Sequence, residues 1–193
     1  AVRERKTDLT EVEHRFGPTV THLVDGVQRM AAISVSQNPG NNAMFNTQSQ
    51  VENLRKMLVT MVDDVRVALI KLAERTCAIR AVKDAPEEKR YRVAREVFDI
   101  YAPLAHRLGI GHIKWELEDL SFRYLEPTQY KQIAKLLDER RLDRQEYIDA
   151  VMAQLREALE EASIHADITG RAKHIYSIWR KMQRKGIDFS QVY

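Results

Sequence analysis

The sequence predicts a mainly α-helical protein that changes to a strand-and-helix architecture near its end. Apolar residues recur at helical spacing in almost every segment between residues 9 and 163, apart from one polar stretch. Residues 164–169 then alternate apolar and polar side chains, as strands do, and Gly170 separates them from a strongly basic helical stretch. A strand that leads into a helix after an all-helical region indicates a domain boundary near Ser163.

The composition is typical of a soluble globular protein. The chain has 193 residues, of which 44% are hydrophobic and 31% charged, enough to bury a sizeable core. No apolar run approaches the length of a membrane span, and the basic N-terminal residues lack the apolar core of a signal peptide. Because Cys77 is the single cysteine, a disulfide framework and a CxxC metal site are excluded. We therefore expect a cytoplasmic protein with no membrane partner.

The first 82 residues predict helices on both sides of one long loop. A short helical pattern at 9–16 stops at Gly17, and Pro18 suits the first turn of a second helix that runs to about Ile33. The expected buried stripe of that helix is Val20, Leu23, Val24 and Val27. Residues 34–49 are rich in Asn, Gln, Ser, Gly and Pro and are expected to form a loop. Residues 51–82 are helical again, and apolar side chains nearly all round the section 65–73 predict a central, largely buried helix.

Clear start and stop signals divide the next part of the chain. Asp84, followed by Pro86 and two glutamates, predicts the start of a helix that extends to about Leu108. Gly109 and Gly111 interrupt it. Further helices are expected at 113–125, 128–140 and 143–163.

The basic helix near the end carries the excess positive charge of the chain. Between Arg171 and Lys185 there are six basic residues and no acidic one, against 31 basic and 28 acidic residues in the whole chain. One side of the helix is the apolar stripe Ile175, Ile178, Trp179 and Met182, and the other side carries Lys173, Ser177, Lys181 and Arg184. The basic side is either an anion site suited to polyphosphate or a solvated face, and the composition favours the anion. No GxxxxGK[ST] motif is present, which excludes a P-loop.

Metal and acid–base chemistry have little support from the residues alone. The six histidines are scattered, without an HExxH motif or an adjacent His-Asp pair, so no metal site is expected. Glu74 follows Lys71 and precedes Arg75 on an apolar helix, a pattern more often found in structural ion pairs than in catalytic acids.

Five segments, taken in order and spacing, carry a family resemblance. They are LVDGV at 23–27, IKLA at 70–73, IYAPLAHRLGI at 100–110, KWELED at 114–119 and GRAKHIYSI at 170–178. With these motifs the chain resembles the RelA/SpoT family of alarmone synthetase/hydrolases, on its synthetase-dedicated, ribosome-associated branch. The resemblance implies a degenerate helical HD hydrolase-like domain at 1–126, a helical connector at 127–163, and at 164–193 the first strand and helix of an incomplete α/β synthetase domain.

The resemblance also implies a reaction and its site. Family synthetases act as GTP pyrophosphokinases in the stringent response, transferring pyrophosphate from ATP, with Mg²⁺, to the 3′-hydroxyl of GTP or GDP. By position, Arg171 would lie against the adenine, and the ATP phosphates would be held by Lys173, Ser177 and Lys181. The ribosome and uncharged tRNA would be bound through C-terminal regions that this sequence does not include.

Departures from the family pattern predict that the hydrolase activity is lost. Where hydrolases have an acidic pair, this chain has Arg3 followed by a glutamate, and where they have an Asp and an Asn four residues apart, it has Glu74 and Ala78. Ala78 cannot bond a nucleotide and Arg3 places a positive charge where an acid assists, so no Mn²⁺ is expected. The segment 189–193 ends at the aromatic residue that precedes the family's Mg²⁺-binding Asp. No complete set of catalytic residues is therefore expected, and the HD-like domain is expected to be regulatory.

Two alternatives remain open. In the first, Glu74 still binds Mn²⁺ and the protein is a bifunctional synthetase/hydrolase. In the second, the basic helix belongs to a non-catalytic module that contacts RNA or another domain. Hydrolysis of the alarmone in the presence of Mn²⁺ would favour the first alternative over the synthetase. Substitutions at Lys173 and Lys181 that leave synthesis intact but abolish ribosome binding would favour the second.

Overall fold

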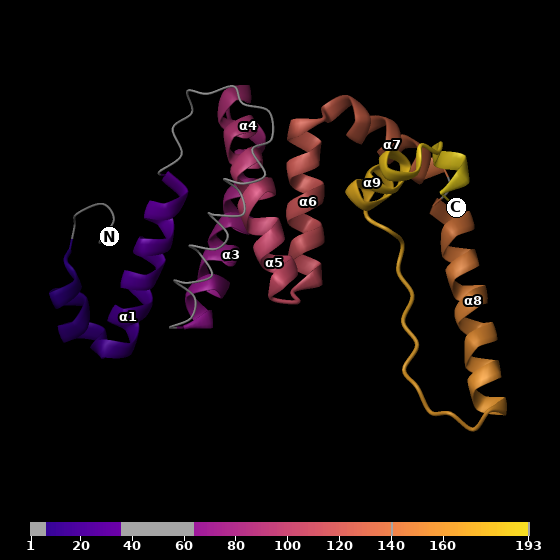
Figure 1. Ribbon diagram of the computed structural model, residues 1–193, viewed down its shortest axis with the longest axis horizontal. Helices are drawn as coiled ribbons and strands as arrows, with labels where there is room; N and C mark the ends of the chain where they lie inside the picture. Colours follow the sequence, from indigo (N-terminus) through magenta and orange to yellow (C-terminus); the bar gives the residue numbers. More distant parts are fainter. Residues whose placement is uncertain (1–6, 36–63, 140, 193) are drawn as a thin grey trace. The chain divides into compact units, whose positions relative to one another are not determined.

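The computed structural model describes residues 7–35, 64–139 and 141–192. All regular structure in these ranges is helical (Figure 1), and the chain divides into two compact units, residues 1–121 and 122–193. The loop expected at 34–49, the first part of the helix expected at 51–82, and Arg3 lie outside the described residues or at their edge. None of the described helices is long and apolar enough to cross a membrane.

The first helix of the first unit bends where the sequence predicts a break. α1 (Leu9–Val35) contains Gly17 at φ 79° and ψ 171°, a non-helical conformation that glycine adopts without steric cost. Pro18 follows directly and begins the second helical section, and the Thr21 hydroxyl donates a hydrogen bond of 3.1 Å to the Gly17 carbonyl. The predicted stop at Gly17 is therefore confirmed.

The next described helix, α3 (Val65–Ala81), is buried on one face only. Asp64 caps it, since its Oδ1 accepts a hydrogen bond of 2.9 Å from the Arg66 amide. One face packs against α1 and the following helices, but Leu69 and Ile70 are 42% and 44% exposed. The expectation of a largely buried helix is thus wrong at these two positions. An apolar composition all round cannot show which sides of a helix will find packing partners.

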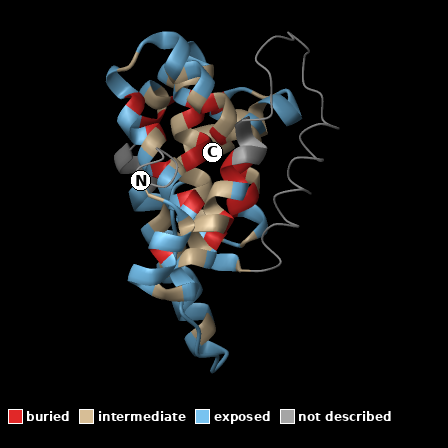
Figure 2. Ribbon diagram, turned by 90° about the vertical axis from the view of Figure 1, so that its left-hand side faces the viewer, coloured by how far each residue is buried: buried red, intermediate tan, exposed pale blue. Residues whose placement is uncertain are grey.

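The region predicted as one helix up to Leu108 is helical but interrupted. A 3₁₀ turn, η1 (Val82–Asp84), precedes α4 (Glu87–Glu96), a π-helical turn, η2 (Val97–Tyr101), and α5 (Ala102–Arg107). In the π-helical turn the Ala102 amide donates to the Val97 carbonyl, immediately before Pro103, which has no N–H to donate. Gly109, at φ 73°, ends the region, and α6 (Gly111–Leu125) follows. The core of this unit includes the fully buried side chains of Leu72, Ile79, Val97, Tyr101, Leu104 and Leu117. Figure 2 colours the ribbon by burial, with buried residues in red.

The second unit has its own hydrophobic core. α7 (Pro127–Glu139) packs against α9 (Ile175–Lys185), and the 3₁₀ turn η3 (Phe189–Gln191) closes the end of this pair. α8 (Arg141–Glu161) lies between α7 and α9 in the sequence. The buried residues of the core are Ile133, Leu137, Ile178, Phe189 and Val192.

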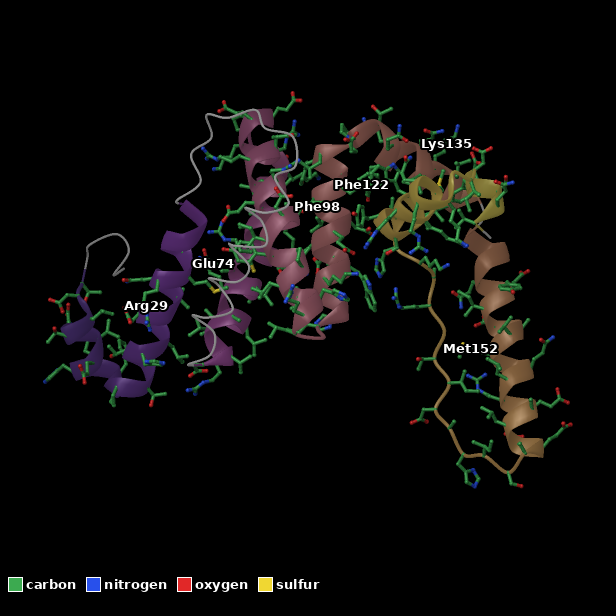
Figure 3. All side chains as sticks on the ribbon, viewed as in Figure 1. Arg29, Glu74, Phe98, Phe122, Lys135 and Met152 are labelled. Atoms are coloured by element: carbon green, nitrogen blue, oxygen red, sulfur yellow. The ribbon has the colours of Figure 1, made fainter. Side chains whose placement is uncertain are left out.

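The predicted strand at 164–169 is not a strand in the structure. Residues 164–174 run from α8 to α9 as irregular chain, and most of their side chains are exposed. A strand requires backbone hydrogen bonds to a neighbouring strand, and nothing in the described ranges forms such a ladder. The segment does touch α8: a Cβ placed on Gly170 would lie 2.6 Å from Ile148 Cγ2 and 2.7 Å from the sulfur of Met152, a residue labelled in Figure 3.

Candidate functional site

The basic helix α9 turns its apolar side inward and its charged side outward. Ile178 is fully buried, and Ile175, Trp179 and Met182 pack against the core of the second unit. Lys173, Arg180, Arg184 and Lys185 are exposed, while Ser177 and Lys181 are half-buried. The predicted inward stripe is therefore confirmed, and the remaining side of the helix presents cations.

Aromatic side chains pack against the inward side of α9. The Phe122 ring centroid lies 5.6 Å from that of Tyr176 and 5.0 Å from that of Trp179, and Tyr130 packs edge-on to Phe122 at 6.2 Å. Such contacts restrict how α9 can rotate about its axis. The charged side consequently keeps a fixed direction relative to α7.

Lys181 is the cation on α9 with the most defined surroundings. Its Nζ donates a hydrogen bond of 3.0 Å to the Val192 carbonyl oxygen. Partial burial lowers the pKa of Lys181, and the positive charges of Lys173, Lys185 and Arg184 lower it further. Lys173, another predicted phosphate ligand, is therefore near enough for its charge to act on Lys181.

The cations gathered around Lys181 suit the binding of a multivalent anion. Cations held near one another repel, and a multivalent anion placed between them would remove the repulsion. Ser177 lies on the first turn of the same helix and offers a hydroxyl, while Arg171 is exposed on the irregular segment before it. Of the four predicted ATP-binding residues, Arg171 and Lys173 thus lie directly before α9, Ser177 lies in its first turn and Lys181 in its second half.

The turn that receives the Lys181 hydrogen bond was not predicted as part of the site. Asp188 and Gln191 form a capping box: the Asp188 side chain accepts from the Gln191 amide, and the Gln191 side chain accepts from the Asp188 amide at 3.1 Å. An Asp followed three residues later by Gln is a local sequence signal that could have identified this turn. The contact with Lys181 joins residues 11 positions apart and has no such signal.

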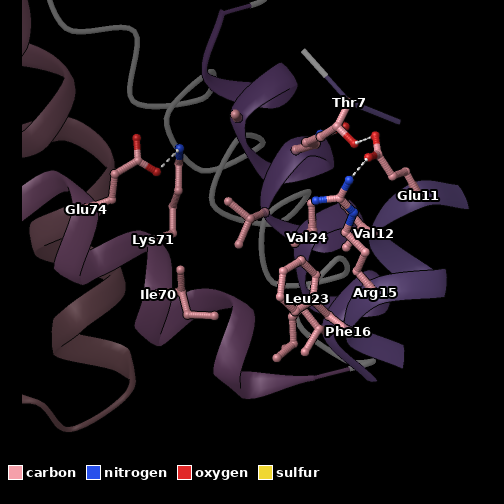
Figure 4. A pocket seen from close by; sticks show the side chains of 14 residues that line it. Thr7, Glu11, Val12, Arg15, Phe16, Leu23, Val24, Ile70, Lys71 and Glu74 are labelled. Atoms are coloured by element: carbon pink, nitrogen blue, oxygen red, sulfur yellow. Dashed lines mark hydrogen bonds and ion pairs between the residues drawn. The ribbon is translucent and has the colours of Figure 1, made fainter. Parts of the chain in front are cut away.

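A second candidate site is an apolar groove of about 840 Å³ in the first unit, between α1 and α3 (Figure 4). Its walls include Val12, Leu23, Val24 and Ile70. Leu23 and Val24 are only half-buried and Val20 is 39% exposed, so the stripe predicted to be buried instead lines this open groove.

Two ion pairs form the polar parts of the groove. Arg15 lies 2.6 Å from Glu11, to which the Thr7 hydroxyl also donates, and Lys71 Nζ donates to Glu74 Oε2 at 2.8 Å.

Glu74, the predicted degenerate metal position, is held between cations. Besides Lys71, the guanidinium of Arg75 lies 3.9 Å from its Oε1, and Arg75 also contacts Glu96 at 3.2 Å. Ala78 follows one turn later on α3 and offers only a methyl group. In the described ranges no three His, Cys, Asp or Glu side chains gather as metal ligands. The structure thus shows Glu74 in a structural ion-pair network.

Comparisons with known proteins identify the family and the relatives of this chain. The family model described as HD domain matches residues 1–111. The chain is 52% identical over 177 residues to the GTP pyrophosphokinase of Escherichia coli strain K12, covering 92% of this chain and 24% of that protein. It is 50% identical over 182 residues to the GTP pyrophosphokinase of Photobacterium angustum, covering 94% of this chain and 24% of the relative. For the GTP pyrophosphokinase of Haemophilus influenzae the identity is 47% over 194 residues, covering 100% of this chain and 25% of the relative. The chain thus spans about a quarter of the length of these relatives.

Proposed function

Because the chain belongs to the HD domain family and, within it, to the RelA/SpoT family, we propose that it is part of a GTP pyrophosphokinase of the stringent response. Such an enzyme transfers pyrophosphate from ATP to the 3′-hydroxyl of GTP or GDP. Relatives named GTP pyrophosphokinase are about 50% identical to the chain over more than 90% of its length. The observation that carries the proposal is the cationic side of α9, on which Lys181 is half-buried and hydrogen-bonded to the Val192 carbonyl oxygen, with Lys173 directly before the helix.

The α9 face suits the ATP side of such a site. Lys173, Ser177 and Lys181 would hold the phosphates, and Arg171 would lie against the adenine. The mutual repulsion of the two lysines supports this role because polyphosphate would neutralise both. Mg²⁺ would compensate the remaining phosphate charge, and the described residues offer no acidic cluster of their own for it. Catalysis would therefore need acidic residues other than those that the structure describes.

The first unit would have a regulatory role without hydrolase activity. Its Glu74 is already neutralised by Lys71 and Arg75, which favours a domain that no longer binds Mn²⁺. The whole protein would act in the cytoplasm and would contact the ribosome and uncharged tRNA through its other regions.

One experiment tests the ATP role with a matched control. In the full-length protein, Lys173→Ala should raise the KM for ATP by roughly 10- to 100-fold, since a charge-assisted hydrogen bond is worth about 1.5–3 kcal/mol. Lys135→Ala is the control, because Lys135 lies on α7 (Figure 3) with 80% of its side chain exposed. The measurement is pyrophosphate transfer from labelled ATP to GTP.

Two outcomes would contradict the proposal. Equal KM values in the Lys173 and Lys135 variants would show that Lys173 does not hold ATP. If Lys173→Ala and Lys181→Ala left synthesis unchanged but abolished ribosome binding, the basic helix would instead belong to a non-catalytic RNA-binding module.

A further inference from the structure

Lys181 is the side chain that joins the charged face of α9 to the turn after it. Its hydrogen bond of 3.0 Å reaches the Val192 carbonyl oxygen at the end of η3. From the other side, Phe189 and Val192 are buried in the core between α7 and α9. The turn is therefore held by apolar packing on one side and by one ammonium group on the other.

We propose that Lys181 couples polyphosphate binding on α9 to the closure of the turn 189–192 against that helix. The inference rests on the proposed function, because it assigns to an ATP-binding residue a second task as a positioning residue. A lysine ammonium has three N–H donors and no acceptor. One donor is used by Val192, which leaves two for a phosphate oxygen, so both partners can be bound at once.

The charges around Lys181 set the direction of this coupling. Partial burial disfavours the protonated form of Lys181, and so do the charges of Lys173, Lys185 and Arg184. A bound polyphosphate would offset the repulsion between these cations and so stabilise the Lys181 ammonium in its place beside the Val192 carbonyl oxygen. Phosphate binding should therefore tighten the link to Val192.

The same coupling must act in the opposite direction. If ligand binding stabilises the closed turn, the closed turn strengthens ligand binding by the same factor. Movements of the residues around 189–192 would then change the affinity for ATP without any direct contact with it. Lys181 would thus link the binding of the nucleotide to the conformation of residues 189–192.

The test is hydrogen exchange of the turn in the full-length protein. The Gln191 amide donates to the Asp188 carbonyl and the Val192 amide to the Phe189 carbonyl, so the exchange of these two amides reports opening of the turn. We expect a non-hydrolysable ATP analogue at saturation to slow their exchange by about tenfold, the scale of a charge-assisted hydrogen bond. Binding of the analogue is measured separately by calorimetry.

Three variants distinguish the effect of Lys181 on the turn 189–192 from its contact with the nucleotide. Lys181→Met without ligand should exchange faster at both amides than the native protein, and Lys181→Arg, which keeps a charged donor, should restore part of the protection. Lys173→Met removes one of the charges that repel the Lys181 ammonium, so its unliganded exchange should be no faster than that of the native protein, and it should still gain protection at saturating analogue. Lys135→Met is the surface control and should behave like the native protein.

The possible failures are distinguishable. If the native protein does not bind the analogue, the proposed ATP site is wrong. If it binds the analogue but the exchange of Gln191 and Val192 does not change, ATP binding stands and the coupling is refuted. Unliganded Lys181→Met with native exchange rates would also refute it, because the hydrogen bond to Val192 would then contribute nothing to the turn.

Discussion

Replacing Gly26 with alanine tests the packing of α1 on α3 directly. A Cβ at this position would lie 2.7 Å from Cγ2 and 3.3 Å from Cγ1 of Val67, a residue that is 2% exposed. Carbon atoms in contact prefer about 3.5–4.0 Å, so the two helices would have to separate by roughly 1 Å. The contact therefore leaves no room for a methyl group on this face of α1.

The expected free energies follow from this geometry. Overpacking costs about 1–3 kcal/mol, and alanine recovers about 1 kcal/mol through its higher helix propensity. Gly26→Ala should thus destabilise the first unit by about 1 kcal/mol. Val67→Ala removes two buried methyl groups, worth about 0.8 kcal/mol each before the cavity term. In the Val67→Ala background the clash is gone, so adding Gly26→Ala should stabilise the protein by up to about 1 kcal/mol.

The measurement is urea unfolding of the four proteins, followed by far-UV circular dichroism and by the fluorescence of Trp115 in a Trp179→Phe background. Trp115 lies in the first unit and therefore reports its unfolding. The decisive result is a change of sign of the Gly26→Ala effect between the two backgrounds. If the substitution has the same effect with and without the Val67 side chain, the close approach of α1 and α3 at this point is wrong.

Two further predictions concern the first unit. With Mn²⁺ present, the full-length protein should not hydrolyse the alarmone, because Glu74 is neutralised by Lys71 and Ala78 has no hydrogen-bonding group; turnover above the enzyme-free rate would show that the hydrolase survives. The Arg66 side chain and amide lower the pKa of Asp64 from 3.8 to about 2, so the stabilisation from this carboxylate should be complete above about pH 4 and lost as the pH falls towards 2. Asp64→Asn keeps a capping side chain without the charge, and the difference in urea midpoint between it and the native protein should shrink over that range. A difference independent of pH would contradict the role of the ion pair.

Local signals in the sequence predicted the helices and their limits well. Gly17 and Gly109 interrupt helices where expected, and both adopt a positive φ. The inward stripe of α9 followed from its spacing alone, since residues three and four apart share a face of any α-helix. Each of these signals is contained within a few residues, so the sequence carries it completely.

Features that depend on distant residues were predicted less well. The alternating segment 164–169 has the pattern of a strand but no neighbouring strand in the described part of the chain, so it remains irregular. Leu69 and Ile70 are apolar yet exposed, because the described helices do not cover these positions of α3.

The candidate site likewise combines features that local sequence predicts with features that depend on distant residues. Local spacing alone predicts that α9 carries cations on one side and apolar residues on the other, because helical periodicity assigns each residue to a face. It also predicts the ion pairs of Glu74 with Lys71 and Arg75, because these three residues are close together on one helix. The contact between Lys181 and the Val192 carbonyl oxygen depends instead on the packing of η3 on α7 and α9. That packing is not encoded in the spacing of residues along one helix.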